Sequence, residues 1–128
     1  MGGHALEGRD VMPDVHATVD QPDPADVLVI RFQSDLSHDR AAELMRTLSD
    51  AIKAGSTRIA LDLSAVAFTS DSSLGAIIKS CKSAREAGGD VRLFGLSRAV
   101  RNFFDAMGLK GVLQCFGNEK DAIQSFEE

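Results

Sequence analysis

Hydroxyl-bearing side chains are concentrated in one short segment, Phe68-Thr69-Ser70-Asp71-Ser72-Ser73-Leu74-Gly75. The segment joins a predicted strand to a predicted helix, so its Ser and Asp side chains can cap the N–H groups of the first helical turn. Helix capping is therefore the simplest role for this cluster.

Patterns that support catalysis or metal binding do not occur in the sequence. The histidines are His4 in the leader, His16 on a predicted edge strand and His38 at a predicted helix start, so no Ser-His-Asp arrangement is suggested near the serine cluster. His38 is most simply a solvated residue of a first helical turn. Metal-ligand spacings, P-loops and the G-x-G-x-x-G and G-x-S-x-G motifs are missing. The sequence therefore predicts a protein that is not an enzyme and uses no metal or cofactor.

Composition excludes further classes of protein. A chain of 128 residues suffices for one compact domain, and its net charge of -5 offers no basic surface for nucleic acid. The longest apolar stretches are far shorter than the roughly 20 residues that span a bilayer, and the first residues do not resemble a secretory signal. We therefore expect a cytoplasmic protein without a membrane-inserted segment. Cys81 and Cys115 are expected to be buried, reduced thiols.

Hydrophobic periodicity indicates where the elements lie. Residues 1–13 show no periodicity and are expected to be a flexible leader, so the folded domain would cover residues 14–128. Ser37, Ser97 and Asn118 are placed to cap helices, and a further helix follows the serine cluster and ends at Gly88-Gly89. The predicted strands are one from Asp14 onward, Val27–Phe32, Ile59–Leu63, Val91–Phe94 and Val112–Cys115.

The predicted order of elements is β-β-α-β-α-β-α-β-α. Strands that alternate with helices imply right-handed crossovers onto a largely parallel sheet, and the initial hairpin adds an antiparallel edge strand. The expected fold class is thus α/β, as a single domain. In this arrangement the serine cluster lies at the carboxyl end of a parallel strand, where a crossover begins.

The same residues carry a resemblance to a known family. Leu61-Asp62-Leu63-Ser64 to Gly75 resembles the central motif of STAS domains, an apolar strand followed by D-S-S/T-G-L-G. Gly88-Gly89-Asp90-Val91-Arg92-Leu93 is similar to the family's turn into its fourth strand. Ser97 to Phe104 resembles its S-P-x-V-x-x-x-L/F helix, and Leu109 to Phe116 resembles its entry into the last strand. The resemblance spans about residues 14–126 and implies a STAS-like fold.

The resemblance also implies which residues act. The phosphorylatable hydroxyl of the family falls on Ser72, and a frame shifted by one residue makes Ser73 the second choice. The family's acidic position at the start of the first helix falls on Ser37, and Asp35 occupies the preceding Glu position. The partner-binding residues implied in this way are Ser37, Ser70, Asp71, Ser72, Ser73 and Leu74.

Two functions are consistent with this resemblance. The first is that of a non-catalytic anti-sigma factor antagonist, which binds a GHKL-type serine kinase acting as anti-sigma factor. Phosphorylation of Ser72 would release it, and a serine phosphatase would restore it, because a phosphate adds roughly -1.5 to -2 charges to the binding surface. The second is that of a constitutive STAS scaffold, or a subunit of a transporter or signalling complex, in which the serines serve only as caps.

Overall fold

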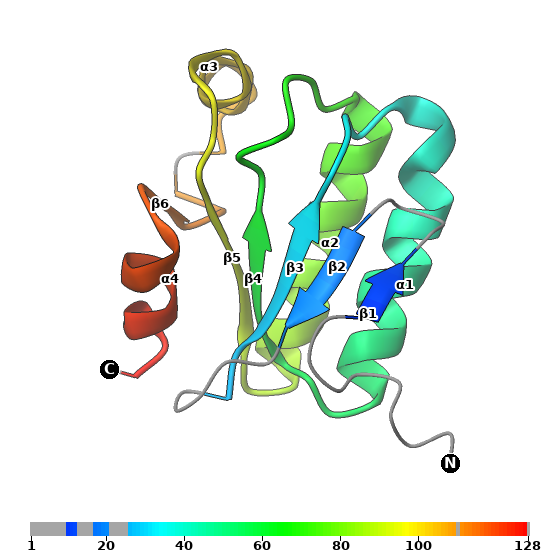
Figure 1. Ribbon diagram of the computed structural model, residues 1–128, viewed down its shortest axis with the longest axis vertical. Helices are drawn as coiled ribbons and strands as arrows, with labels where there is room; N and C mark the ends of the chain where they lie inside the picture. The colour runs from blue at the N-terminus through cyan, green and yellow to red at the C-terminus, as the bar shows by residue number, and fades with distance from the viewer. Residues whose placement is uncertain (1–9, 13–16, 21–25, 110, 128) are drawn as a thin grey trace.

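Figure 1 shows the computed structural model of the chain, which describes residues 10–12, 17–20, 26–109 and 111–127. Six strands form one sheet: β1 (Asp10–Met12), β2 (Ala17–Asp20), β3 (Leu28–Phe32), β4 (Arg58–Asp62), β5 (Asp90–Phe94) and β6 (Cys115–Phe116). The helices are the 3-10 turn η2 (His38–Arg40), α1 (Ala41–Lys53), α2 (Asp71–Glu86), α3 (Arg98–Ala106) and α4 (Glu119–Ser125).

The strands lie in the sheet in the order in which they occur in the chain. β3, β4, β5 and β6 are parallel, with Leu28 opposite Ile59 and Ile59 opposite Val91, whereas β1 and β2 are antiparallel. Parallel neighbours require crossover connections, which α1, α2 and α3 provide. The structure confirms the expected α/β fold with a mostly parallel sheet and an antiparallel edge.

The beginning of the domain differs from the sequence-based prediction. Asp10–Met12 was placed in the leader, but it forms β1 and pairs with β2, with Val11 opposite Thr18. A segment of three residues is too short to show the period-2 alternation that identifies a strand in a sequence. This strand is therefore recognised only from its pairing with β2. The remaining leader positions, 1–9 and 13, lie outside the described residues, as does the predicted strand start at 14–16.

Two further element boundaries differ from those predicted from the sequence. Val112, predicted to be in the last strand, lies in a turn in which its N–H donates to the Leu109 carbonyl at 2.9 Å, and β6 is only Cys115–Phe116. Ser37 precedes the short turn η2 and makes no capping hydrogen bond through its side chain, so α1 begins at Ala41. A 3-10 turn before an α-helix is a common way for a helix to start, and it displaces the first residue of the regular helix.

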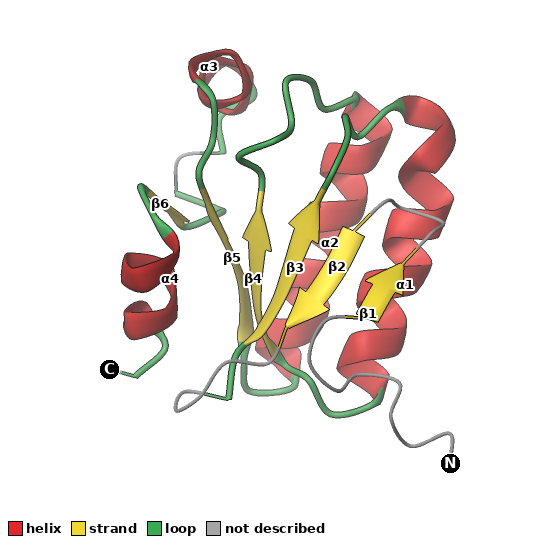
Figure 2. Ribbon diagram, in the orientation of Figure 1, coloured by secondary structure: helices red, strands yellow, loops and turns green. Residues whose placement is uncertain are grey.

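Two apolar cores pack against the sheet, one on each face. Figure 2 shows α1 and α2 against one face and α4 against the other. The larger core includes Leu28, Ile30, Leu61 and Leu93 of the strands and packs against the buried sides of α1 and α2. The smaller core contains Val27, Val29, Ala60, Phe94, Ala122 and Phe126. Burial on both faces explains the continuous apolar run from Val27 to Ile30, which leads into β3 and ends before Arg31.

Candidate functional site

Two connecting loops meet at the carboxyl ends of β3 and β4, the end at which α3 lies in Figure 1. Backbone hydrogen bonds join them: the Leu36 N–H donates to the Phe68 carbonyl at 3.0 Å, and the Ser70 N–H donates to the Leu36 carbonyl at 2.8 Å. The Asp35 carboxylate accepts from the Ala67 N–H at 2.7 Å. These bonds hold η2 and the start of α2 next to each other.

Ser70 is the residue that caps α2. Its backbone is extended, and its hydroxyl oxygen accepts a hydrogen bond from the Ser73 N–H at 3.1 Å. The side chain is almost inaccessible, with 8% of the residue exposed. The predicted capping role is confirmed for Ser70, and α2 begins at the next residue, Asp71, which is exposed. The carboxylate of Asp71 is thus in the first turn, where the helix dipole favours an anion.

Ser73 lies in the interior. The residue is 0% exposed, and its hydroxyl donates to the Ser37 carbonyl oxygen at 3.0 Å. A phosphate on this oxygen would lack space and would break the bond to the loop, so the structure gives no support to Ser73 as the second choice of acceptor. Leu74, at 1% exposure, belongs to the large core and cannot reach a partner.

Ser72 is the serine of the cluster that remains at the surface. Its side chain is half-buried, and its Oγ lies 2.6 Å from Nδ1 of His38, at the start of η2. This is the contact that the sequence did not reveal: His38 is exposed, as expected for a first-turn residue, but it also contacts the predicted phosphoacceptor. The only signal was that His38 follows Ser37, which the family resemblance placed among the partner-binding residues.

The predicted partner-binding residues separate into two groups. Ser37, Asp71 and Ser72 remain at least partly accessible, whereas Ser70, Ser73 and Leu74 are buried. The Ser37 hydroxyl donates to the Asp39 carboxylate at 2.6 Å, and this hydrogen bond is the main cause that lowers the pKa of the exposed Asp39. The accessible part of the site is therefore acidic and hydroxyl-rich.

Phe68 adds an apolar element that the sequence analysis did not single out. The residue is 54% exposed, an unusual state for a large apolar side chain, and immediately precedes Thr69 and the capping serine. It borders a small hollow of about 130 Å³ whose other walls include Val100 and Phe103 of α3. The signal in the sequence was an apolar run, Ala65 to Phe68, in a segment that had to be a loop. An exposed aromatic side chain of this kind is a suitable anchor for a protein partner.

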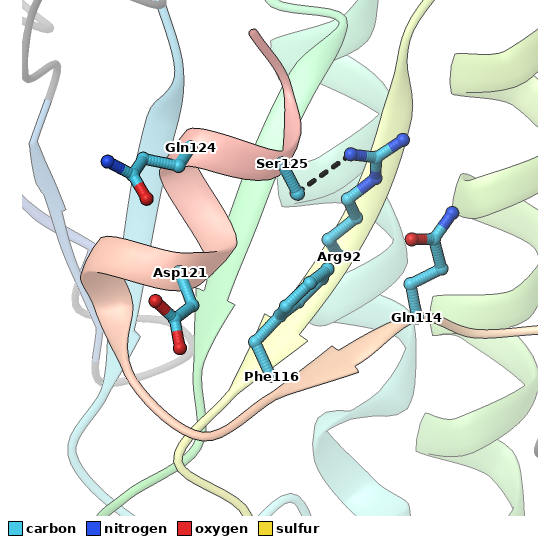
Figure 3. Close-up of a pocket in the computed structure, with 6 residues that line it drawn as sticks. All are labelled: Arg92, Gln114, Phe116, Asp121, Gln124 and Ser125. Atoms are coloured by element: carbon cyan, nitrogen blue, oxygen red, sulfur yellow. Dashed lines mark hydrogen bonds between the residues drawn. The ribbon is translucent and has the colours of Figure 1, made fainter. Parts of the chain in front are cut away.

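A second, larger hollow lies on the α4 side of the sheet (Figure 3). It has a volume of about 670 Å³ and is lined by Arg92, Gln114, Phe116, Asp121, Gln124 and Ser125. The Arg92 guanidinium is already engaged, because it donates to Asp90 at 2.9 Å and to the Ser125 hydroxyl at 2.8 Å, and lies 4.4 Å from the centre of the Phe126 ring. We interpret this arginine as a link between β5 and α4, and none of the predicted site residues lines the hollow.

Within the described part of the chain, three or more His, Cys, Asp or Glu side chains do not gather into a group that could hold a metal ion. Among the same residues, every helix is too short or too polar to span a membrane.

Comparison with known proteins identifies the family. The STAS domain family matches residues 17–122 of this chain. A curated relative is the anti-sigma F factor antagonist of Paenibacillus polymyxa, which is 26% identical over 102 residues that cover 79% of this chain and 87% of the relative. The chain belongs to the STAS domain family.

Solved structures show the same fold at low sequence identity. The crystal structure of the Thermotoga maritima protein tm1081 superposes with a TM-score of 0.77 at 19% identity. The match covers 98% of the present chain and 99% of the tm1081 chain. The anti-sigma factor antagonist SpoIIAA in its unphosphorylated form gives a TM-score of 0.73 at 22% identity, over 87% of this chain and 96% of that one. The phosphorylated form of the Bacillus protein SpoIIAA gives a TM-score of 0.65 at 22% identity. This match covers 85% of the present chain and 97% of the SpoIIAA chain.

Proposed function

We propose that this protein is an anti-sigma factor antagonist, a non-catalytic binding module that phosphorylation of Ser72 switches off. The observation that carries the proposal is the position of Ser72: its hydroxyl is at the surface in the first turn of α2, while Ser70 and Ser73 on either side are buried. The curated relative and SpoIIAA are named anti-sigma factor antagonists, and SpoIIAA is described in a phosphorylated and an unphosphorylated form.

The charge of a phosphate is sufficient for a switch. Two negative charges at about 5 Å from one partner carboxylate repel it by roughly 6 kcal/mol at an effective dielectric constant near 20. Reversing a bound population from 99:1 to 1:99 requires about 5.5 kcal/mol. Asp71 is exposed beside Ser72, so the phosphate would increase an existing negative charge. The helix start can accommodate the anion, so the fold should survive the modification.

The partner would be a cytosolic serine kinase of the GHKL type that acts as anti-sigma factor, and a serine phosphatase would reverse the reaction. We expect Phe68 to provide the apolar centre of the interface, with Ser37, Asp71 and Ser72 at its polar rim, because these side chains are accessible at one end of the sheet. In this scheme the chain is the substrate of a kinase and not itself an enzyme.

Binding measurements with two variants of Ser72 test the proposal. Ser72→Ala should bind the candidate anti-sigma factor irrespective of ATP, whereas Ser72→Asp should bind at least tenfold more weakly, because a carboxylate carries part of the charge of a phosphate. Ser83→Asp is the matched control, since Ser83 is exposed on the same helix. Incubation with the kinase and ATP, followed by intact-mass spectrometry and peptide mapping, should locate the phosphate on Ser72.

A second candidate function is a constitutive STAS scaffold. The observation in its favour is that two of the serines have structural roles, Ser70 as the cap of α2 and Ser73 as the link to the Ser37 carbonyl. Equal affinities of Ser72→Ala and Ser72→Asp for the partner, together with no modification of Ser72 by candidate kinases, would favour the scaffold and contradict the switch.

A further inference from the structure

The contact between His38 and Ser72 joins two segments that are 34 residues apart. The distance of 2.6 Å between Nδ1 and Oγ is that of a short hydrogen bond, in which the tautomer of the ring decides which atom donates. The backbone bonds between the two loops and the link from Ser73 to the Ser37 carbonyl fix η2 against α2. The imidazole therefore stays next to the atom to which a phosphate would be attached.

The surroundings of this pair are rich in acids. η2 itself carries Asp39 and Arg40 next to His38, the first turn of α1 carries Glu43, and the first turn of α2 carries Asp71. Three carboxylates and one guanidinium give these groups a net charge of about -2 at neutral pH. A phosphate on Ser72 would add up to two further negative charges, so a cation in direct contact with it would be strongly favoured.

We propose that His38 is the counter-ion of the phosphate on Ser72, so that phosphorylation replaces the present hydrogen bond by an imidazolium–phosphate ion pair. The inference rests on the proposed function in one respect only, namely that Ser72 is the residue that carries the phosphate. His38 does not take part in a bond-forming step. It is a positioning residue that holds the phosphate at the start of α2.

The ion pair makes the phosphorylated state depend on pH in a range in which few other groups titrate. Histidine changes its charge between about pH 5 and 8, and the second ionisation of a phosphoserine has a pKa near 6. The positive charge of the imidazolium stabilises the doubly ionised phosphate, so it should lower the second pKa of the phosphate. An opposite charge within about 4 to 6 Å shifts a pKa by one unit or more, and we expect about one unit here because the site is accessible.

The test uses the full chain with phosphoserine introduced at position 72 by genetic incorporation, and no kinase is needed. A pH titration of the 31P chemical shift gives the second pKa of the phosphate directly. The comparison variant is His38→Asn, which retains a hydrogen-bonding group near the position of Nδ1 but cannot carry a positive charge. Phosphoserine at position 83, about 16 Å further along α2 by the helical rise, is the control for a phosphate on the same helix.

The expected result is a phosphate pKa about one unit lower at position 72 in the otherwise unchanged protein than in the His38→Asn variant, with no such difference at position 83. Equal values at position 72 with and without His38 would overturn the proposal. Because the phosphate is installed without a kinase, this outcome is distinct from failure of the proposed function, which would appear as the absence of enzymatic phosphorylation or of any effect of Ser72 variants on partner binding.

Discussion

The Ser73 hydroxyl donates a hydrogen bond to the Ser37 carbonyl oxygen at 3.0 Å and so ties the first turn of α2 to the residue that precedes η2. The Ser73 side chain is inaccessible to solvent. Its hydrogen bond to Ser37 is one reason why His38 and Ser72 are in contact. The two neighbouring serines therefore differ in their surroundings: Ser73 is buried and fixes the geometry of the site, whereas Ser72 is partly accessible.

Replacement of Ser73 by alanine should destabilise the protein. The variant leaves the Ser37 carbonyl without this donor, and the loss of such a hydrogen bond costs about 1 kcal/mol. Ser83→Ala is the matched control, because Ser83 is exposed on the same helix and the change in helix propensity is the same. The free energy of unfolding from urea denaturation should be lower for Ser73→Ala than for Ser83→Ala by about this amount. Equal stabilities of the two variants would show that the bond contributes nothing.

Much of the fold could be predicted from the sequence because its signals are local. The period of apolar residues located α1 and α2, and the cap of α3 was correctly assigned to Ser97, whose hydroxyl accepts from the Val100 N–H. β1 was not predicted because a three-residue strand shows no alternation of apolar and polar residues. It is defined only by its pairing with β2. The last strand was shifted because Val112 is apolar but lies in a turn.

The candidate site could be predicted only in part, for a similar reason. Capping by a serine or aspartate of the cluster was expected from the sequence, and the structure assigns it to Ser70. The choice of Ser72 rests on the family motif, which is also local in the chain. Which side chains face outward depends on tertiary packing, so Leu74 and Ser73 were assigned to the partner surface although they are buried. The pairing of His38 with Ser72 crosses two elements and has no local signature.

Phe68 is expected to be a major contributor to partner binding. Phe68→Ala removes an aromatic side chain from a residue that is 54% exposed, so the affinity for the proposed partner, an anti-sigma factor, should fall at least tenfold while stability changes little. Met107→Ala provides the comparison, since Met107 is exposed to a similar extent, 49%, at the end of α3. Calorimetric titration of both variants measures the effect. If Phe68→Ala binds like the unchanged protein, the interface does not include the apolar loop.

Cys81 should resist modification until the protein unfolds. Burial and a hydrogen bond to the Asp90 carboxylate raise the pKa of its thiol to about 11, so little of the reactive thiolate exists at pH 8. Burial also raises the pKa of Cys115, but this residue is only half-buried. In a Cys115→Ser variant, labelling with a thiol reagent at pH 8 should therefore be slow in native protein and rapid in urea. Fast labelling of the folded variant would contradict the buried position of Cys81.

Asp90 is a buried carboxylate at the start of β5 that links this strand to α2. It accepts from Arg85 of α2 at 2.8 Å, from Arg92 of β5 at 2.9 Å and from the Cys81 thiol at 3.1 Å. Burial alone would raise its pKa, but the hydrogen bonds from Arg92, Cys81 and Arg85 outweigh burial and hold the pKa below its ordinary value. The ionised form is therefore the one that the fold stabilises.

Asp90→Asn should lower the free energy of unfolding at pH 7 by about 2 to 3 kcal/mol. Breaking a fully buried ion pair costs about 3 to 5 kcal/mol, and the cost here is smaller because the Arg85 side chain is 42% exposed. A lowered folded-state pKa contributes stability above the unfolded value near 4, and this contribution is lost as the pH falls from about 5 downward. The difference between Asp90→Asn and the unchanged protein should therefore narrow below about pH 5. Asp50→Asn, at an exposed position of α1, is the control for the same substitution outside this cluster. Urea unfolding from pH 7 to 3 measures all three proteins, and a pH-independent difference would refute the role assigned to the Asp90 charge.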